Sequence, residues 1–398
     1  MLENELGVLN SIYRGYEEEV DKNPNGYKIG SSITIRRPAD FTVRTGATMN
    51  VQDVLEGGVP LTVDTQKGVD FQFSSTELTL SIEELSERVI QPAMSSLVND
   101  IASDIFTTMY KGAYEFVGTM GTAIDSYAKF ARFPTRMDHC ATPTVARKVL
   151  LHTDDNWGMI GQQTQLYSGS PGLVNQAYTE GNLGKVAGCD TYSSQVAPTH
   201  TVGPLGGTPA VNDTSGSQNV TYNTAKDTWS QSLITDGWTA SAAARVKAGD
   251  SFTIATVYKV NPKTKATTAI LQDFVVLADA SSDGSGNLTM TISPPIITSG
   301  PHQTVNQAPA DGALLTFRGT ANTTYRQNLA YFKNAMAMCF VPMEIPQGAV
   351  NVSRRTYKGL SVRLIPVYDG VNDLSKWRLD VLYGKKPIDP RKIVRGAG

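Results

Sequence analysis

The chain has 398 residues, of which 40% are hydrophobic and 18% charged, and its formal net charge at pH 7 is −2. This length predicts two or three folded domains rather than one. The near-neutral charge gives no general electrostatic case for nucleic-acid binding, which normally requires a basic face or stripe.

The cysteines and the N-terminus bear on where the protein is made. Cys140, Cys189 and Cys339 lie too far apart for metal or redox spacings, which predicts buried thiols in a reducing compartment. The N-terminus lacks the cationic and apolar regions of a signal peptide, and no apolar run approaches the roughly 18 residues of a membrane helix. We therefore expect a protein that is intracellular when made, without a membrane partner.

The first 73 residues predict an arm followed by a β ribbon. Apolar residues recur at helical spacing between residues 2 and 20, and the turn sequence at residues 23–26 ends this helix. Residues 31–44 and 69–73 then alternate between apolar and polar side chains, which indicates extended strands. An isolated two-stranded ribbon is marginal in water, so we expect it to lie against other surfaces.

A long helix is predicted over residues 81–111. Ser81 and Glu84 form the S-x-x-E pattern of a capping box, and a single apolar stripe continues to about Tyr110. At 1.5 Å per residue the helix is roughly 45 Å long, which exceeds the width of a small domain. Pro92 removes one backbone donor, and we expect it to kink the helix.

The middle of the chain predicts an α/β region that is interrupted by a β module. A helix is expected over residues 142–151 and a core strand over 186–192, followed by a Gly, Pro, Thr and Ser-rich linker at 201–217. Residues 249–297 alternate with period two between turn sequences, which is typical of a small barrel or sandwich. Nothing in this module resembles a site, so a structural module is favoured over a ligand-binding one.

The C-terminal part returns to mixed structure. Leu329, Phe332, Ala335, Met336 and Cys339 fit one face of a helix. Residues 360–364 and 377–383 then predict two paired strands, and the chain ends in a segment with five basic residues. These are Lys385, Lys386, Arg391, Lys392 and Arg395.

No catalytic, cofactor or metal site is predicted. His139, His152, His200 and His302 stand alone, without the neighbouring ligands of a helical metal site. His139 and Cys140 are sequence neighbours, which rarely meet in the geometry of a nucleophile and its base. The basic residues Arg36, Arg37 and those of the tail fit either DNA phosphates or salt bridges between subunits.

The order of these elements is similar to that of one protein family. Residues 28–38 (KIGSSITIRRP), 69–89 (VDFQFSSTELTLSIEELSERV) and 178–192 (YTEGNLGKVAGCDTY) carry the likeness, together with 249–300, 328–342 (NLAYFKNAMAMCFVP) and 380–384 (DVLYG). In these segments the chain resembles the major capsid (coat) proteins of short-tailed double-stranded DNA bacteriophages. The segments are spread over most of the chain and keep their order.

The resemblance implies an α+β fold, the capsid fold shared by tailed phages and herpesviruses, with an inserted small β-barrel domain. In that fold residues 1–30 are an N-terminal arm and 31–75 an extended loop that reaches over a neighbouring subunit. Residues 76–141 and 369–398 form a peripheral domain, and the spine helix lies within it. Residues 142–201 and 324–368 form an axial domain, which is split by the insertion domain at 202–323.

The same resemblance implies partners and contacts. Many copies of the chain are expected to form pentamers and hexamers, with scaffolding and portal proteins and packaged double-stranded DNA as further partners. The expected location is the virion capsid, assembled in the host bacterial cytoplasm. Intersubunit contacts are expected at Arg36, Arg37, Arg44, Glu56 and Lys67. We expect the arm and the ribbon to bury most of their apolar surface only against neighbouring subunits.

Two other functional hypotheses remain open from the sequence. An encapsulin-like compartment shell shares the fold, but its usual form lacks the inserted β module. An enzyme with a β accessory domain would need a constellation of polar residues that this one sequence does not reveal.

Overall fold

The computed structural model describes residues 2–17, 32–49, 51–74, 89–163, 181, 183–213, 218–241, 243–346, 348 and 351–398. Contacts divide the chain into two compact units, each made of segments distant in sequence. The first unit comprises Met1–Thr34, Pro60–Phe106 and Met336–Lys386. The second unit comprises Ile35–Val59, Thr107–Ala335 and Pro387–Gly398.

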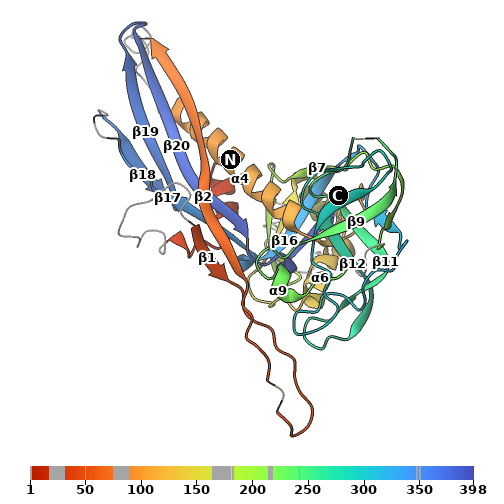
Figure 1. The fold of residues 1–398 in the computed structure, drawn as a ribbon. Coiled ribbons are helices and arrows are strands. Elements are labelled where there is room, and N and C mark those ends of the chain that lie inside the picture. Colours follow the sequence, from red (N-terminus) through yellow and green to blue (C-terminus); the bar gives the residue numbers. More distant parts are fainter. Residues whose placement is uncertain are drawn as a thin grey trace. The chain divides into compact units, whose positions relative to one another are not determined.

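The first unit is built on a mostly antiparallel sheet with one long helix. Its elements are α1 (Leu2–Leu9), β1 (Ser32–Arg36), β2 (Gly58–Ser74), α4 (Gln91–Gly112), β17 (Met336–Val341), β18 (Ser353–Tyr357), β19 (Leu360–Asp369) and β20 (Leu374–Pro387). The strand order is β1-β2-β20-β19-β18, and β17 also pairs with β20. Figure 1 shows β19 and β20, in blue, beside β2, in orange.

The alternating sequence patterns explain this sheet. Burial alternates along the first half of β2, where Val59, Leu61 and Val63 are buried and their neighbours are not. The predicted pairing of the last two strands is confirmed, since Arg363 lies opposite Asp380 and Asp369 opposite Leu374. The ribbon predicted between residues 31 and 73 is only partly regular, because the described residues 37–49 and 51–57 contain no strand.

The N-terminal arm packs within its own unit. Leu6, Leu9 and Ile12 are buried at 3%, 2% and 1% exposure, and the main-chain N–H of Met338 donates to the carbonyl of Tyr13 at 3.3 Å. The expectation that the arm buries its apolar residues only against neighbours is therefore wrong for residues 5–12. The reason is that β17 offers an apolar surface inside the same chain.

Helix α4 holds the apolar stripe that the sequence predicted. Val98, Ile101 and Ile105 are fully buried. On the same helix Asp100 forms an ion pair with Lys67 at 2.6 Å. The capping box at Ser81 lies outside the described residues. Pro92 is the second residue of α4, and Val89 and Ile90 directly before this helix are π-helical; the kink stays a prediction.

The second unit contains two larger sheets and a two-stranded ribbon. Its helices are α5 (Tyr127–Phe130), α6 (Arg132–His139), α7 (Thr153–Gln163), α9 (Tyr222–Ala225), η2 (Lys333–Ala335) and η3 (Pro390–Lys392). Its strands are β3 (Glu115–Val117), β4 (Arg147–His152), β5 (Lys185–Val186), β6 (Cys189–Ser194), β7 (Thr199–Thr201), β8 (Gly207–Val211), β9 (Gln231–Trp238), β10 (Ala244–Val246), β11 (Ser251–Val260), β12 (Thr267–Val276), β13 (Ala280–Ser281), β14 (Leu288–Ser293), β15 (Leu315–Phe317), β16 (Thr324–Phe332) and β21 (Ile393–Ala397).

One sheet is mixed and the other antiparallel. The mixed sheet has the order β3-β21-β16-β4-β6-β5, with β7 also paired to β16. Its parallel pairs are β3 with β21 and β4 with β6. The antiparallel sheet has the order β15-β11-β12-β14-β9-β8 and encloses a core that includes Phe252, Phe274 and Trp238. The predicted β module at residues 249–297 lies in this sheet.

The helices predicted over residues 142–151 and at residues 329–339 are wrong. Residues 147–152 form β4, and residues 324–341 form β16, a 3-10 turn and β17. Strand β16 pairs with β21 on one side and β4 on the other, and Leu329, Ala330 and Tyr331 are all fully buried. A central strand buried on both faces shows no alternation, so its short apolar run cannot be told from a helix by period alone.

Gly249 is a backbone position where only glycine fits. Its φ is +105°, and a Cβ would lie 2.9 Å from Tyr110 Cε2 and 3.2 Å from the His200 ring. We expect Gly249→Ala to lower the free energy of unfolding by roughly 2 kcal/mol or more, since a strained φ alone costs about 1–3 kcal/mol. Urea unfolding measures this change. Gly284→Ala is the control, because a Cβ there meets open space; equal losses for both variants would contradict the prediction.

Candidate functional site

The described residues hold no metal constellation. No group of three or more His, Cys, Asp or Glu side chains within them is placed to hold a metal ion. The Cys140 thiol accepts a hydrogen bond from Lys259 Nζ at 3.0 Å, and burial, together with Glu115, raises its pKa to about 12. A thiol with this pKa stays protonated at neutral pH and is a poor nucleophile. No helix in the described part of the chain is long and apolar enough to cross a membrane.

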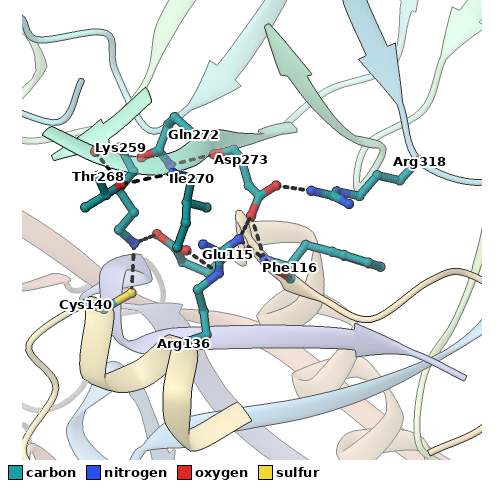
Figure 2. Close-up of polar contacts among 10 residues, drawn as sticks. All are labelled: Glu115, Phe116, Arg136, Cys140, Lys259, Thr268, Ile270, Gln272, Asp273 and Arg318. Carbon is teal, nitrogen blue, oxygen red and sulfur yellow. Dashed lines mark hydrogen bonds and ion pairs between the residues drawn. The ribbon is translucent and has the colours of Figure 1, made fainter. Parts of the chain in front are cut away.

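A network of buried ions lies at the centre of the second unit (Figure 2). The carboxylate of Asp273 on β12 is paired with Arg136 of α6 and with Arg318. It also accepts a hydrogen bond from the N–H of Phe116 on β3 at 3.3 Å. Asp273 is 1% exposed, so these donors replace the water that it loses on folding.

Glu115 on β3 is the second carboxylate of this network. Its oxygens are paired with Lys259 of β11 and, at 3.2 Å, with Arg136 Nε. Burial acts to raise the pKa of Glu115, but Lys259 and Arg136 outweigh it and lower the pKa below its ordinary value. Glu115 is therefore ionised at neutral pH. The network joins β11 and β12 of the antiparallel sheet to β3 of the mixed sheet and to α6.

The segment between β1 and β2 is the second candidate, and we call residues 37–57 the β1–β2 loop. Its start is tied down, because the buried Arg37 side chain donates to the carbonyls of Ile388 at 2.7 Å and Lys226 at 3.1 Å. Its middle exposes large apolar side chains that no described part of this chain covers. These are Phe41 (56% exposed), Val43 (97%), Met49 (77%), Val51 (76%) and Val54 (65%).

The residues predicted to make intersubunit contacts fall in different places. Arg36 and Glu56 face each other across the base of the β1–β2 loop at 3.2 Å, and both are exposed. Arg44 donates to main-chain carbonyls of its own loop, including Thr48 at 3.1 Å. Lys67 belongs to the first unit and is paired with Asp100 of α4. Only Arg37 is buried, and its side chain is committed to contacts within the chain.

The basic C-terminal segment is folded rather than a free tail. Arg395 is fully buried in β21, donates to the carbonyl of Gly249, and has its pKa lowered by burial to about 10. Arg391 is paired with Asp389 at 2.8 Å and with Asp40 at 2.9 Å. Lys385 is paired with Asp104. Contacts within the chain therefore account for these three cations, two through ion pairs and Arg395 through a main-chain carbonyl, whereas the expected alternatives were DNA phosphates or salt bridges between subunits.

The sequence reasoning missed the members of the ion network. Each is a lone charged residue within an apolar strand segment, as in AYEFV around Glu115, TVYKV around Lys259 and LQDFVV around Asp273. A charge in such a segment needs a partner once it is buried. That pattern is a usable signal, but it does not identify which charges will pair.

Comparisons with known proteins give one family. A family model described as "P22 coat protein - gene protein 5" matches residues 22–396. A relative named "Major capsid protein", from Acyrthosiphon pisum secondary endosymbiont phage 1, is 22% identical over 367 residues, which cover 89% of this chain and 85% of the relative. A solved chain from Mycobacterium phage Che8 has a TM-score of 0.51 at 11% identity and covers 98% of this chain and 89% of that chain. At this identity the Che8 likeness shows the fold alone.

The buried network predicts a large stability effect at Asp273. We expect Asp273→Asn to lower the free energy of unfolding by roughly 3 kcal/mol, because it removes the counter-charge of Arg318 and leaves the buried Arg136 with Glu115 alone. Urea unfolding of the unassembled subunit measures this. Asp125→Asn is the control: Asp125 pairs with Lys129 at 2.8 Å with both side chains partly exposed, and we expect a loss below about 1 kcal/mol. A small effect at Asp273 would show that the network is not stabilising.

His302 predicts a dependence of stability on pH. It is 7% exposed and stacks on Tyr222 with ring centroids 3.5 Å apart. Burial lowers its pKa to about 4; Asp40 opposes this shift, and Arg391 and Lys265 add to it. The unfolded chain binds the proton near pH 6.5 and the folded chain only near pH 4, so acidification favours unfolding. Between these values we expect the free energy of unfolding to fall by about 1.4 kcal/mol per pH unit through this group.

The measurement compares urea unfolding of the wild type and His302→Gln at several pH values between 7 and 4.5. The variant lacks the titrating ring, so its stability should fall less steeply with acid. Parallel pH profiles for the two proteins would contradict the assignment.

Proposed function

The chain belongs to the P22 coat protein family and is a phage major capsid protein, and we infer that many copies of it form an icosahedral shell around the double-stranded DNA genome of a tailed phage. The family match over residues 22–396 is the observation that carries this conclusion. The predicted α+β capsid fold of tailed phages is confirmed. Coat proteins are structural, so the family supports neither the enzyme hypothesis nor the compartment-shell hypothesis.

We propose that the β1–β2 loop makes a principal contact between subunits. Its apolar side chains are too exposed to stabilise the isolated chain, and burying each of them contributes roughly 1.5–3 kcal/mol. Its charged base, Arg36 and Glu56, lies at the surface, where a neighbour's charges can reach it. Arg44 and Lys67 are kept as further candidates for contacts between subunits. Arg37 instead anchors the start of the loop.

The finer parts of this function are also proposals. The six-stranded antiparallel sheet falls within residues 202–323, which supports an insertion domain there. The division into arm, peripheral and axial domains, the pentamers and hexamers, and the scaffolding and portal partners follow from the family resemblance. So does assembly in the host bacterial cytoplasm. A shell repeats each contact many times, so individually modest interfaces suffice for collective stability.

Electron microscopy tests the function and the role of the loop together. We expect purified wild-type protein, under assembly conditions, to form closed shells visible by negative stain. We expect Val43→Asp to leave subunit unfolding unchanged but to raise the critical concentration for assembly by at least about tenfold, because a carboxylate is desolvated without a partner.

Val145→Asp is the matched control, since Val145 is 76% exposed and lies outside the loop. Assembly by Val43→Asp at the wild-type concentration would remove the loop from the interface. A wild-type protein that stays a small particle under all assembly conditions would overturn the shell itself.

A further inference from the structure

A cavity of about 400 Å³ lies in the second unit, and Pro38 and Asp40 at the start of the β1–β2 loop line part of it. Three segments supply its charged wall: Asp40 at the start of that loop, Lys263 and Lys265 in the turn between β11 and β12, and Arg391 with Lys392 near the C-terminus. Its volume is within the range of small-ligand sites, about 300–1,000 Å³.

The cavity wall carries more positive than negative charge. Five cationic side chains line it, and three carboxylates pair with them. The cations are Lys259, Lys263, Lys265, Arg391 and Lys392, and the carboxylates are Asp40, Glu115 and Asp389. The positive excess is concentrated in the turn between β11 and β12.

Lys265 is the cation that folding leaves uncompensated. None of the ion pairs found within the described residues includes it, whereas Lys263 Nζ lies 3.5 Å from Asp40 and is 71% exposed. Lys265 is half-buried, and burial lowers its pKa, with Arg391 and Lys263 acting in the same direction and Asp40 opposing them. Its backbone is left-handed with φ +59°. Such strain at a residue beside a cavity is typical of a functional position.

The aromatic wall limits what can bind. The Trp229 indole is already covered by the guanidinium groups of Arg37 at 5.8 Å and Arg391 at 5.3 Å. His302, which also lines the cavity, is stacked on Tyr222, and the lining residue Tyr114 is only 5% exposed. A nucleotide base would need an accessible aromatic face, so the cavity fits a compact anion better than a nucleotide.

We propose that this cavity binds a small oxyanion, a phosphate or a carboxylate group, through the ammonium groups of Lys265 and Lys263, while Arg391, whose guanidinium nitrogens donate to Asp40 and Asp389, adds its positive charge to the wall. The anion neutralises the positive excess and accepts charge-assisted hydrogen bonds. Because both ammonium groups belong to the turn between β11 and β12, binding orders that turn beside Asp40.

The experiment titrates inorganic phosphate into the unassembled full-length subunit by calorimetry at constant ionic strength, with chloride as the reference anion. We expect saturable binding to the wild type and about tenfold or more weaker binding to Lys265→Gln, the loss expected for one charge-assisted hydrogen bond. Lys265→Arg should retain binding. Lys185→Gln is the control, because Lys185 is exposed on β5 outside the cavity.

Several outcomes overturn the proposal. The first is that chloride produces the same heat as phosphate. The second is that Lys265→Gln binds phosphate as tightly as the wild type. The third is that Lys185→Gln loses as much phosphate affinity as Lys265→Gln. A second titration with acetate separates the two sources: acetate binding assigns a carboxylate as ligand, and phosphate binding alone assigns a phosphate. Binding of a DNA duplex without binding of free phosphate also contradicts a small-anion site. If Lys265→Gln is unfolded by circular dichroism, Lys263→Gln replaces it, and unchanged phosphate affinity in that variant counts against the site.

Discussion

Asp273 and Glu115, two carboxylates buried away from water, constrain how the second unit is joined together. Removing an ion from water costs several kcal/mol, and only close, well-directed partners offset that cost. Those partners are supplied by different elements: Arg136 from α6, Lys259 from β11, and Arg318 after β15. Ion pairs need specific partners at short distance. The network therefore favours one placement of β11 and β12 against β3 and α6.

Apolar residues of the second unit are found in two opposite environments, one buried and one exposed. Its interior is closed, with Phe252, Phe274 and Trp238 packed between strands. The β1–β2 loop instead leaves Val43 almost fully exposed while Arg37 anchors its start. A loop whose start is anchored and whose apolar side chains are exposed suits an interface with another copy of the chain. The closed interior thus keeps the unit folded, and the exposed loop is left for the assembly of a shell.

Shifted pKa values in this protein have a structural rather than a catalytic explanation. Groups with perturbed pKa values often mark active sites, but ion networks also produce them. Here the pKa of Glu115 is lowered by cations that it needs for burial, and the Cys140 thiol beside it is kept protonated. Neither group faces a nucleophile and base arrangement. The charged interior serves folding, which agrees with membership of a coat protein family.

The sequence by itself determined the parts of the fold that repeat a local period. Alternation identified the strand pair of β19 and β20 and the β module, and one apolar stripe identified the buried face of α4, because these periods follow from the local geometry of strands and helices. It failed for β4 and β16, which are buried within the mixed sheet and lose that contrast. The ion partners were decided only by the tertiary structure: Arg136 and Asp273 are 137 positions apart. Lone charges in apolar strands show that partners are needed, but only packing selects them, since Coulomb attraction depends on distance in space and not on distance along the chain.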